Sequence, residues 1–165
     1  MTEFALVAPV LLLILFAIIQ FGFLLGGQIG MTNGVREAAR YASTVQIATA
    51  AQAGPAAVQV KAELRDRALA RAIPGYNVAN FDNSAATTVL YCAYQNPNST
   101  VADPSYSIKV RVTAIYKHPL FVPLVNLVVD AIDGTSDGKL KATATEEMRV
   151  ENPRLTSDGG LPACP

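Results

Sequence analysis

The sequence contains few of the residues on which catalysis and metal binding depend. His118 is the only histidine, and the two cysteines form no Cys-x-x-Cys pair, so we expect no zinc site. The sequence also lacks Gly-x-Ser-x-Gly, and the glycines of 26–34 lack the Lys-Ser/Thr of a phosphate loop. His118 precedes Pro119 without a neighbouring acid or nucleophile pattern, which favours a turn or sheet-edge position. We therefore expect no enzyme, no catalytic residue and no cofactor.

Charged residues are scarce and balanced. The 13 basic and 13 acidic residues give a pI near 6.6, so the chain has no basic surface for nucleic acid, and we expect no nucleic-acid partner. Asp130, Asp133 and Asp137 lie close together in the sequence and could hold calcium, but their spacing does not match an EF-hand loop. A polar turn is the preferred interpretation, and no metal site is expected.

Between Glu3 and Arg36 there is no charge at all, and this region contains a long apolar run. Nearly every residue from Phe4 to Phe23 is apolar, and about 20 such residues cross a bilayer core of about 30 Å. The run lacks the basic n-region and the small-residue cleavage site of a secretory signal, so we expect it to remain in the mature protein. Arg36 and Arg40 follow it, and the positive-inside rule would place them in the cytoplasm. That rule conflicts with an extracytoplasmic location for the rest of the chain.

Helical spacing continues beyond the apolar run as far as Gly54-Pro55, where we expect the helix to break. The small or apolar residues with this spacing are Val35, Ala38, Ala39, Ala42, Val45 and Thr49. The sequence therefore predicts an N-terminal helix over residues 1–53, followed by an α+β domain over residues 54–165.

Four glycines recur every four residues within this helix: Gly22, Gly26, Gly30 and Gly34. Glycine is unfavourable in a helix, but a stripe of glycines lets another backbone approach closely. One hypothesis is a helix that packs tightly against copies of itself or melts locally when it does so. The alternative is a loose linker between a membrane anchor and a domain.

The rest of the chain predicts one short helix and a small antiparallel sheet. After Pro55, apolar residues on one side (Val60, Leu64, Ala68 and Ile73) oppose a charged run at 61–67, which we expect to be solvated. Strand patterns cover residues 87–94, 106–116 and 139–150, the last two with clear alternation. The apolar, proline-containing segment 118–138 is expected to be a loop or short helix that covers the sheet edge. The predicted class is α+β.

Two further predicted features depend on the compartment in which the chain folds: a disulfide and a glycosylation site. A disulfide between Cys92 and Cys164 would tie down the turn-rich C-terminal tail in an oxidising, extracytoplasmic compartment, and two separate buried thiols are the alternative. Asn98 begins Asn-Ser-Thr, which has the form of an N-glycosylation acceptor.

Both ends of the sequence resemble TadE-like proteins, which belong to the type IV pilin superfamily and are linked to tight-adherence (Flp) pili. The opening "EFALVAPVLLLILFAIIQFG" has the Glu-Phe-Ala head, the proline and the aromatic-Gly pair of that family, and "TNGVREAARYAS" has its Ala-Ala-Arg-x-Ala. The matching residues are Glu3, Phe4, Ala5, Pro9, Phe21, Gly22, Ala38, Ala39, Arg40 and Ala42. Near the other end, "VRVTAIYKHPLFVPLV" and "LKATATEEMRVE" resemble the family's strands and its proline-rich loop.

The resemblance implies a route of maturation and assembly. A prepilin peptidase would remove a short leader, and the apolar helix would sit in the inner membrane before it packs into a filament core. In the superfamily the glutamate is usually the fifth mature residue, whereas here it is the third. The cut therefore lies closer to Glu3, or two residues precede Met1 in the mature chain. We hypothesise that Glu3 pairs with a neighbouring subunit's N-terminal amine and sets the register, the alternative being a helix N-terminal carboxylate at the lipid surface.

The resemblance implies a structural pilin subunit that polymerises through its N-terminal helix into an extracellular pilus. Its partners would be copies of itself, the inner-membrane assembly machinery, the prepilin peptidase and, before assembly, membrane lipid. Pro9 either kinks the helix to ease this packing or lies in its first turns, where proline costs less. The alternatives are a minor pseudopilin or assembly factor, and a membrane-anchored extracytoplasmic binding domain that does not polymerise.

Overall fold

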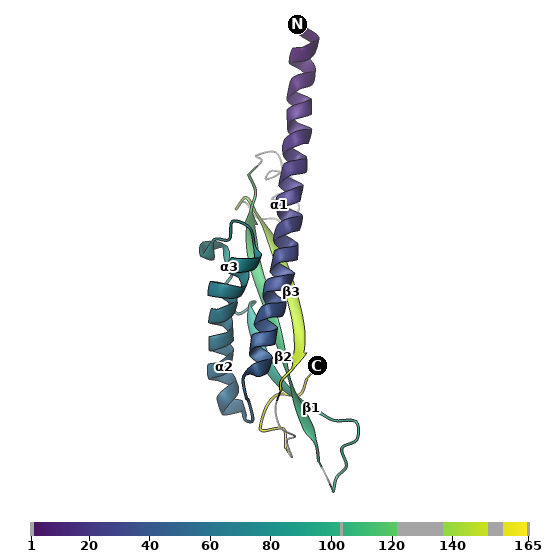
Figure 1. Cartoon of the computed structure of the whole chain (residues 1–165), viewed down its shortest axis with the longest axis vertical. Coiled ribbons are helices and arrows are strands. Elements are labelled where there is room, and N and C mark those ends of the chain that lie inside the picture. The colour runs from purple at the N-terminus through teal and green to yellow at the C-terminus, as the bar shows by residue number, and fades with distance from the viewer. Residues whose placement is uncertain (1, 103, 122–136, 152–156, 165) are drawn as a thin grey trace.

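The longest element is the N-terminal helix α1 (Thr2–Thr44), formed by the apolar run together with the alanine-rich segment that follows it. The computed structural model describes residues 2–102, 104–121, 137–151 and 157–164. Figure 1 shows that α1 extends far beyond the rest of the chain at its N-terminal end. The helix continues through Pro9 without interruption.

The prediction that the first helix runs to Gly54 is wrong, since α1 ends at Thr44 and helix α2 (Ala50–Glu63) begins soon after it. Thr49 precedes α2 in an extended conformation, and the Gln52 side-chain oxygen accepts hydrogen bonds from the backbone N–H groups of Ala48 (2.8 Å) and Thr49 (3.3 Å). Thr-x-x-Gln is a capping-box sequence that starts a new helix. Gly54 and Pro55 therefore lie inside α2 and do not separate two elements.

The second helical segment continues from α2 through a π-helical turn η1 (Leu64–Ala68) into α3 (Leu69–Ala72). The predicted apolar side is confirmed, because Val60, Leu64, Ala68 and Ile73 are all buried. A turn at Pro74-Gly75, with Gly75 at φ 68°, ends this segment, and a 3₁₀ turn η2 (Val78–Asn80) follows.

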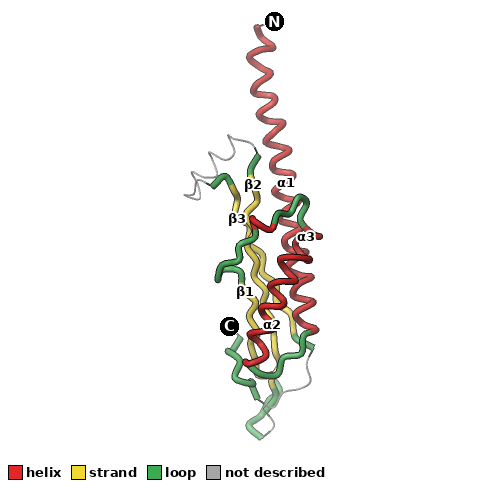
Figure 2. The backbone as a smooth tube through the Cα atoms, turned by 90° about the vertical axis from the view of Figure 1, so that its left-hand side faces the viewer, coloured by secondary structure: helices red, strands yellow, loops and turns green. Residues whose placement is uncertain are grey.

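Three antiparallel strands form the sheet in the order β1-β2-β3. They are β1 (Thr88–Gln95), β2 (Tyr106–Pro119) and β3 (Lys139–Arg149), so the three predicted strands are confirmed and β2 extends three residues further than expected. Figure 2 shows the helices on one side of the sheet, where α1 packs across β2 and β3 and α2 packs against β1. The α+β class is confirmed. The segment 122–136, predicted to cover the sheet edge, lies outside the described residues.

The core lies between this helical layer and the inner face of the sheet. Its fully buried members include Val35 of α1, Leu64 of η1 and Val110 and Val112 of β2. Because α1 supplies part of this core, the globular part of the molecule includes the C-terminal half of the first helix. The division into domains 1–53 and 54–165 stays a prediction.

The C-terminal tail lies beside β1. Cys92 and Cys164 form a disulfide, as the sequence predicted, and Ala163 forms a parallel bridge with Ala93. The backbone N–H of Ala93 donates to the Pro162 carbonyl (2.9 Å), and the N–H of Cys164 donates to the Ala93 carbonyl (3.0 Å). The covalent link and these two hydrogen bonds anchor a segment that would otherwise have little structure of its own.

Candidate functional site: the exposed apolar half of the first helix

Residues 2–19 of α1 are called here the exposed half, because none of its described side chains is buried by the rest of the described chain. Every large apolar side chain from Leu6 to Ile19 is exposed, and Phe4 and Leu6 reach 77% exposure. Because consecutive residues are exposed, the apolar surface surrounds the helix completely. A helix that is apolar all round is stable only when lipid or other helices bury it.

The length of the exposed half matches a bilayer. Its residues 2–19 span about 27 Å at about 1.5 Å per residue, against a hydrocarbon core of about 30 Å. Within the described ranges, α1 is the one helix that is long and apolar enough to cross a membrane. This geometry fits a single N-terminal membrane anchor.

Gln20 marks the point where the globular part begins to cover the helix. It is only 2% exposed, although its neighbours Ile19 and Phe21 are exposed. The backbone N–H of Phe121, just beyond β2, donates to Gln20 Oε1 at 2.9 Å. The Phe121 ring also packs edge-on against Phe23, with 6.3 Å between ring centroids. Residues 20–44 are called here the covered half.

The four glycines of the predicted stripe separate into two pairs. An added Cβ at Gly22 or Gly26 would meet nothing within 4 Å. At Gly30 it would lie 2.2 Å from the Ala72 carbonyl oxygen, and at Gly34 2.8 Å from Leu69 Cδ2. Gly30 and Gly34 therefore let the chain's own α3 approach the helix, which stays continuous across all four positions. Packing of Gly22 and Gly26 against copies of the chain stays a prediction.

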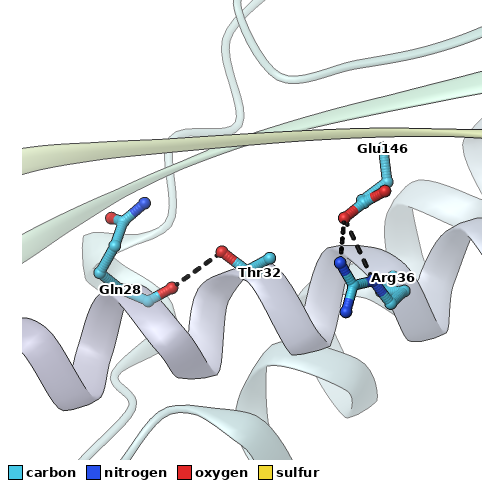
Figure 3. A network of polar contacts seen from close by, with 4 residues as sticks. All are labelled: Gln28, Thr32, Arg36 and Glu146. Carbon is cyan, nitrogen blue, oxygen red and sulfur yellow. Dashed lines mark hydrogen bonds and ion pairs between the residues drawn. The ribbon is translucent and has the colours of Figure 1, made fainter.

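A polar stripe on the covered half faces β3 (Figure 3). Thr32 Oγ1 donates to the Gln28 carbonyl (3.1 Å), and the Arg36 guanidinium forms an ion pair with Glu146 (2.9 Å). Gln28 Nε2 also lies 3.5 Å from the Thr143 carbonyl oxygen. Arg36, the first basic side chain after the apolar run, is therefore paired with Glu146 of β3. The orientation of the helix across a membrane stays a prediction.

His118 does not lie in a turn, but near the end of β2, beyond the residues that pair with β1, where its strand partner is Leu140 of β3. It lies on the central strand β2 and is 7% exposed, with its ring edge-on to Tyr116 at 4.8 Å between centroids. Burial lowers the pKa of the imidazole below its ordinary value. An added Cβ at Gly27 would lie 2.1 Å from His118 Cε1, so the absence of a side chain at Gly27 makes room for this ring.

The remaining predicted residues are spread along the chain. Glu3 lies near the start of α1, Pro9 is exposed within α1, and Asn98 is exposed in a turn between β1 and β2. Met1 lies outside the described residues, as do Asp130 and Asp133. Asp137 forms an ion pair with Lys117 (3.4 Å). In the ranges that the structure describes, no group of His, Cys, Asp and Glu side chains could hold a metal ion.

The sequence analysis assigned no role to three residues that affect how α1 packs and where it ends: Gln20, Gly27 and Gln52. Gln20 had a visible signal, because it is the one amide side chain within the apolar run. Gln52 had one too, in Thr49-x-x-Gln52. Gly27 had none, since the contact that requires it comes from His118, far away in the sequence.

The fold and the exposed half together define a class of protein, namely an α+β domain carried by a single apolar N-terminal helix. Residues 1–40 of the chain match the family model of the TadE-like proteins. This match confirms the resemblance over that segment and associates the chain with tight-adherence pili. Comparison with curated proteins and with solved structures gave no match.

Proposed function

We propose that the protein is a structural pilin subunit, which polymerises through the exposed half of α1 into a tight-adherence pilus. The observation that carries this proposal is the apolar surface that surrounds residues 4–19 on all sides. A surface of this kind needs a complete apolar environment, and a bundle of identical helices provides one.

The environment of the exposed half would change once during the life of the subunit. Before assembly the helix lies in the inner membrane, and afterwards neighbouring subunits replace the lipid in the core of an extracellular filament. Full burial of one Leu, Ile or Phe side chain contributes about 1.5–3 kcal/mol relative to water, so neither environment can be exchanged for solvent. Release from lipid therefore requires the assembly machinery of the inner membrane, which we propose as a partner, together with a prepilin peptidase.

Identical subunits form a filament when they contact one another head to tail and the contacts do not close into a ring. In this arrangement Glu3 would lie near the N-terminal amine of Met1 from a neighbouring subunit. An ion pair in an apolar core is tolerated when both charges are matched, and breaking it is strongly unfavourable. Glu3 would thus favour one axial register over the others.

The test is the recovery of filaments from cells that express the full chain with its pilus system. Electron microscopy and mass spectrometry of sheared surface material should identify this chain as the main band of a thin filament. Glu3→Ala should reduce filament yield about tenfold or more, as expected when one partner of a buried charge pair is removed. Glu37→Ala changes an exposed carboxylate on the covered half of the same helix and serves as the matched control with normal yield.

Other outcomes would replace the proposal. If the filaments consist of another protein and this chain stays in the membrane fraction, it is a minor pseudopilin or an assembly factor. If it neither enters filaments nor affects their yield, and still binds a partner as a monomer, it is a membrane-anchored extracytoplasmic binding domain. Normal yield with Glu3→Ala would refute the register role of Glu3 while leaving polymerisation itself intact.

A further inference from the structure

Residues 157–164, called here the C-terminal segment, connect two parts of the fold that lie far apart in the sequence. At one end, Cys164 is joined to Cys92 of β1 by the disulfide. Towards the other end, the Gly159 carbonyl accepts a hydrogen bond of 3.0 Å from the backbone N–H of Ala50, the first residue of α2. The segment therefore links the edge of the sheet to the start of the second helix.

The start of α2 depends on this contact. The first N–H groups of a helix have no partner within the helix itself and must find one elsewhere. The Gln52 side chain accepts from the N–H groups of Ala48 and Thr49, just before the helix, and Gly159 accepts from Ala50. The junction between α1 and α2 is thus held by one side chain of α2 and by the C-terminal segment.

Two neighbouring glycines show how closely the segment fits this junction. An added Cβ at Gly159 would lie 2.1 Å from the Ala48 carbonyl oxygen, so no side chain fits there. At Gly160 the nearest atom would be Ala50 Cβ, at an ordinary 3.9 Å. Both glycines have a positive φ, 64° and 74°, which favours glycine at each position. Only position 159 therefore combines this backbone conformation with direct contact to the junction.

The disulfide at the other end can be approached from solvent. A cavity of about 330 Å³ lies beside it, and its lining includes Tyr94, Tyr106 and Cys164. Cys92 is only 3% exposed, whereas Cys164 is partly exposed. The cavity therefore gives a small dithiol an approach from the side of Cys164.

We propose that the C-terminal segment couples the redox state of the Cys92–Cys164 disulfide to the order of the α1–α2 junction. A dithiol supplies two electrons and two protons, so that the S–S bond becomes two thiols while the dithiol closes into its own disulfide. The segment then keeps its hydrogen bonds to Ala50 and Ala93 and the buried side chain of Leu161. A terminal segment with so few contacts frays, and the first turn of α2 opens when the Gly159 carbonyl is withdrawn.

This coupling would complete the fold only in an oxidising compartment, where the disulfide forms and persists. The inference rests on the proposed function for that compartment alone, because the contacts that carry it lie within one chain. The junction would therefore become ordered after the domain has left the cytoplasm.

The first test needs no variant. Hydrogen–deuterium exchange of the full chain in detergent micelles is measured by mass spectrometry, for the oxidised protein and for protein kept reduced by dithiothreitol. Labelling for seconds to minutes reports local opening. The peptide 46–53 should exchange at least about tenfold faster after reduction. The peptide 69–80, which has no contact with the C-terminal segment among the described residues, should not change.

The second test leaves the disulfide intact and displaces the segment at its other end. Gly159→Ala should accelerate exchange of the peptide 46–53 in the oxidised protein, because its Cβ collides with Ala48. Gly160→Ala is the matched control, since it brings the same backbone strain without that collision and should leave this peptide unchanged. In reduced protein Gly159→Ala should add little, because the segment has already been released.

Unchanged exchange of the peptide 46–53 after reduction would overturn the proposal, and so would an equal increase in both peptides, which would mean general destabilisation. Equal effects of the two alanine variants would overturn the role of Gly159. Failure here is distinct from failure of the pilin proposal, because the measurement uses the isolated chain. A chain that forms filaments but shows no coupling contradicts only this inference.

Discussion

The two halves of α1 form one continuous helix, but their surroundings are opposite. In the exposed half, large apolar residues surround the helix. In the covered half, a stripe of small and apolar residues faces the domain and a polar stripe faces β3. Helix formation alone therefore does not determine the role of either half. The distribution of apolar residues around the circumference does, because a one-sided stripe can be buried by the same chain and an all-round surface cannot.

The glycines of α1 likewise differ in whether the rest of the chain packs against them. Gly30 allows the backbone of α3 to approach α1 within the molecule, whereas Gly26 has open space where a side chain would be. Within the covered half, Gly30 and Gly34 are therefore already packed against α3, whereas Gly22 and Gly26 remain open. Packing of Gly22 and Gly26 against copies of the chain stays a prediction.

The largest expected effect comes from a change that destabilises the globular part and leaves the exposed half of α1 unchanged. The Cys92–Cys164 disulfide closes a loop with a sequence separation of 72 residues. Replacing both cysteines with serine should lower the free energy of unfolding by about 4 kcal/mol, mainly through the larger entropy of the unfolded chain. Guanidinium titration of the detergent-solubilised full chain, followed by tyrosine fluorescence, measures this difference.

Reduced wild-type protein is the control and should unfold at the same denaturant concentration as the double-serine variant. The exposed half should remain helical and membrane-inserted in both, since no described residue of the domain covers it. Unchanged stability after reduction would mean that noncovalent contacts hold the tail, among them the hydrogen bonds of Ala93 and the burial of Leu161.

The second prediction compares one alanine substitution at a packed glycine of α1 with one at an open glycine. Gly30→Ala places a Cβ 2.2 Å from the Ala72 carbonyl oxygen, so α1 and α3 must move apart. We expect a loss of about 1–3 kcal/mol of stability, as is typical of overpacking. Gly26→Ala meets nothing within 4 Å and should be neutral or stabilising by up to about 1 kcal/mol, because alanine favours the helix.

Both variants are compared with wild type in the same guanidinium titration. Opposite signs for the two substitutions would support the division of the glycine stripe into an intramolecular and an open pair. Equal losses at both positions would show that the stripe acts as one unit, most simply through contacts between subunits.

The sequence was sufficient to predict the class, the three strands, the buried side of the second helix and the disulfide. These features follow from local periodicity or from the presence of only two cysteines. It was insufficient for the end of α1, because the alanine-rich spacing continues across Val45–Thr49 while the capping interaction of Gln52 overrides it. It also failed for His118 and Gly27, whose environments depend on each other across the fold.

The third prediction is that the stability of the fold depends on pH through His118, which packs against Gly27 of α1. Because burial lowers the pKa of His118 in the folded state, the unfolded chain binds a proton first as the pH falls. Stability should therefore decrease below the ordinary histidine pKa of about 6.5 and level off below the lower pKa of the folded state. His118→Gln removes this titration.

The difference in unfolding midpoint between wild type and His118→Gln, measured at several pH values, isolates this contribution from the carboxylates. Asp82, for example, has a pKa lowered chiefly by hydrogen bonds with Ser84, so its contribution is lost only in more acidic solution. A difference that does not change between neutral and mildly acidic pH would show that His118 is hydrated in the folded protein.

The smallest expected effect concerns the ion pair between Arg36 and Glu146 in the polar stripe of the covered half. It tests how much this pair contributes to the stability of the fold. Arg36 and Glu146 are 59% and 25% exposed, and exposed ion pairs contribute at most about 1 kcal/mol. A double-mutant cycle with Arg36→Met and Glu146→Gln should give a coupling energy of about 0.5 kcal/mol that decreases as salt screens the pair. A coupling above about 2 kcal/mol would instead place this pair in a desolvated environment, as if neighbouring subunits covered it even before assembly. The covered half would then resemble the exposed half in needing partners from outside the chain.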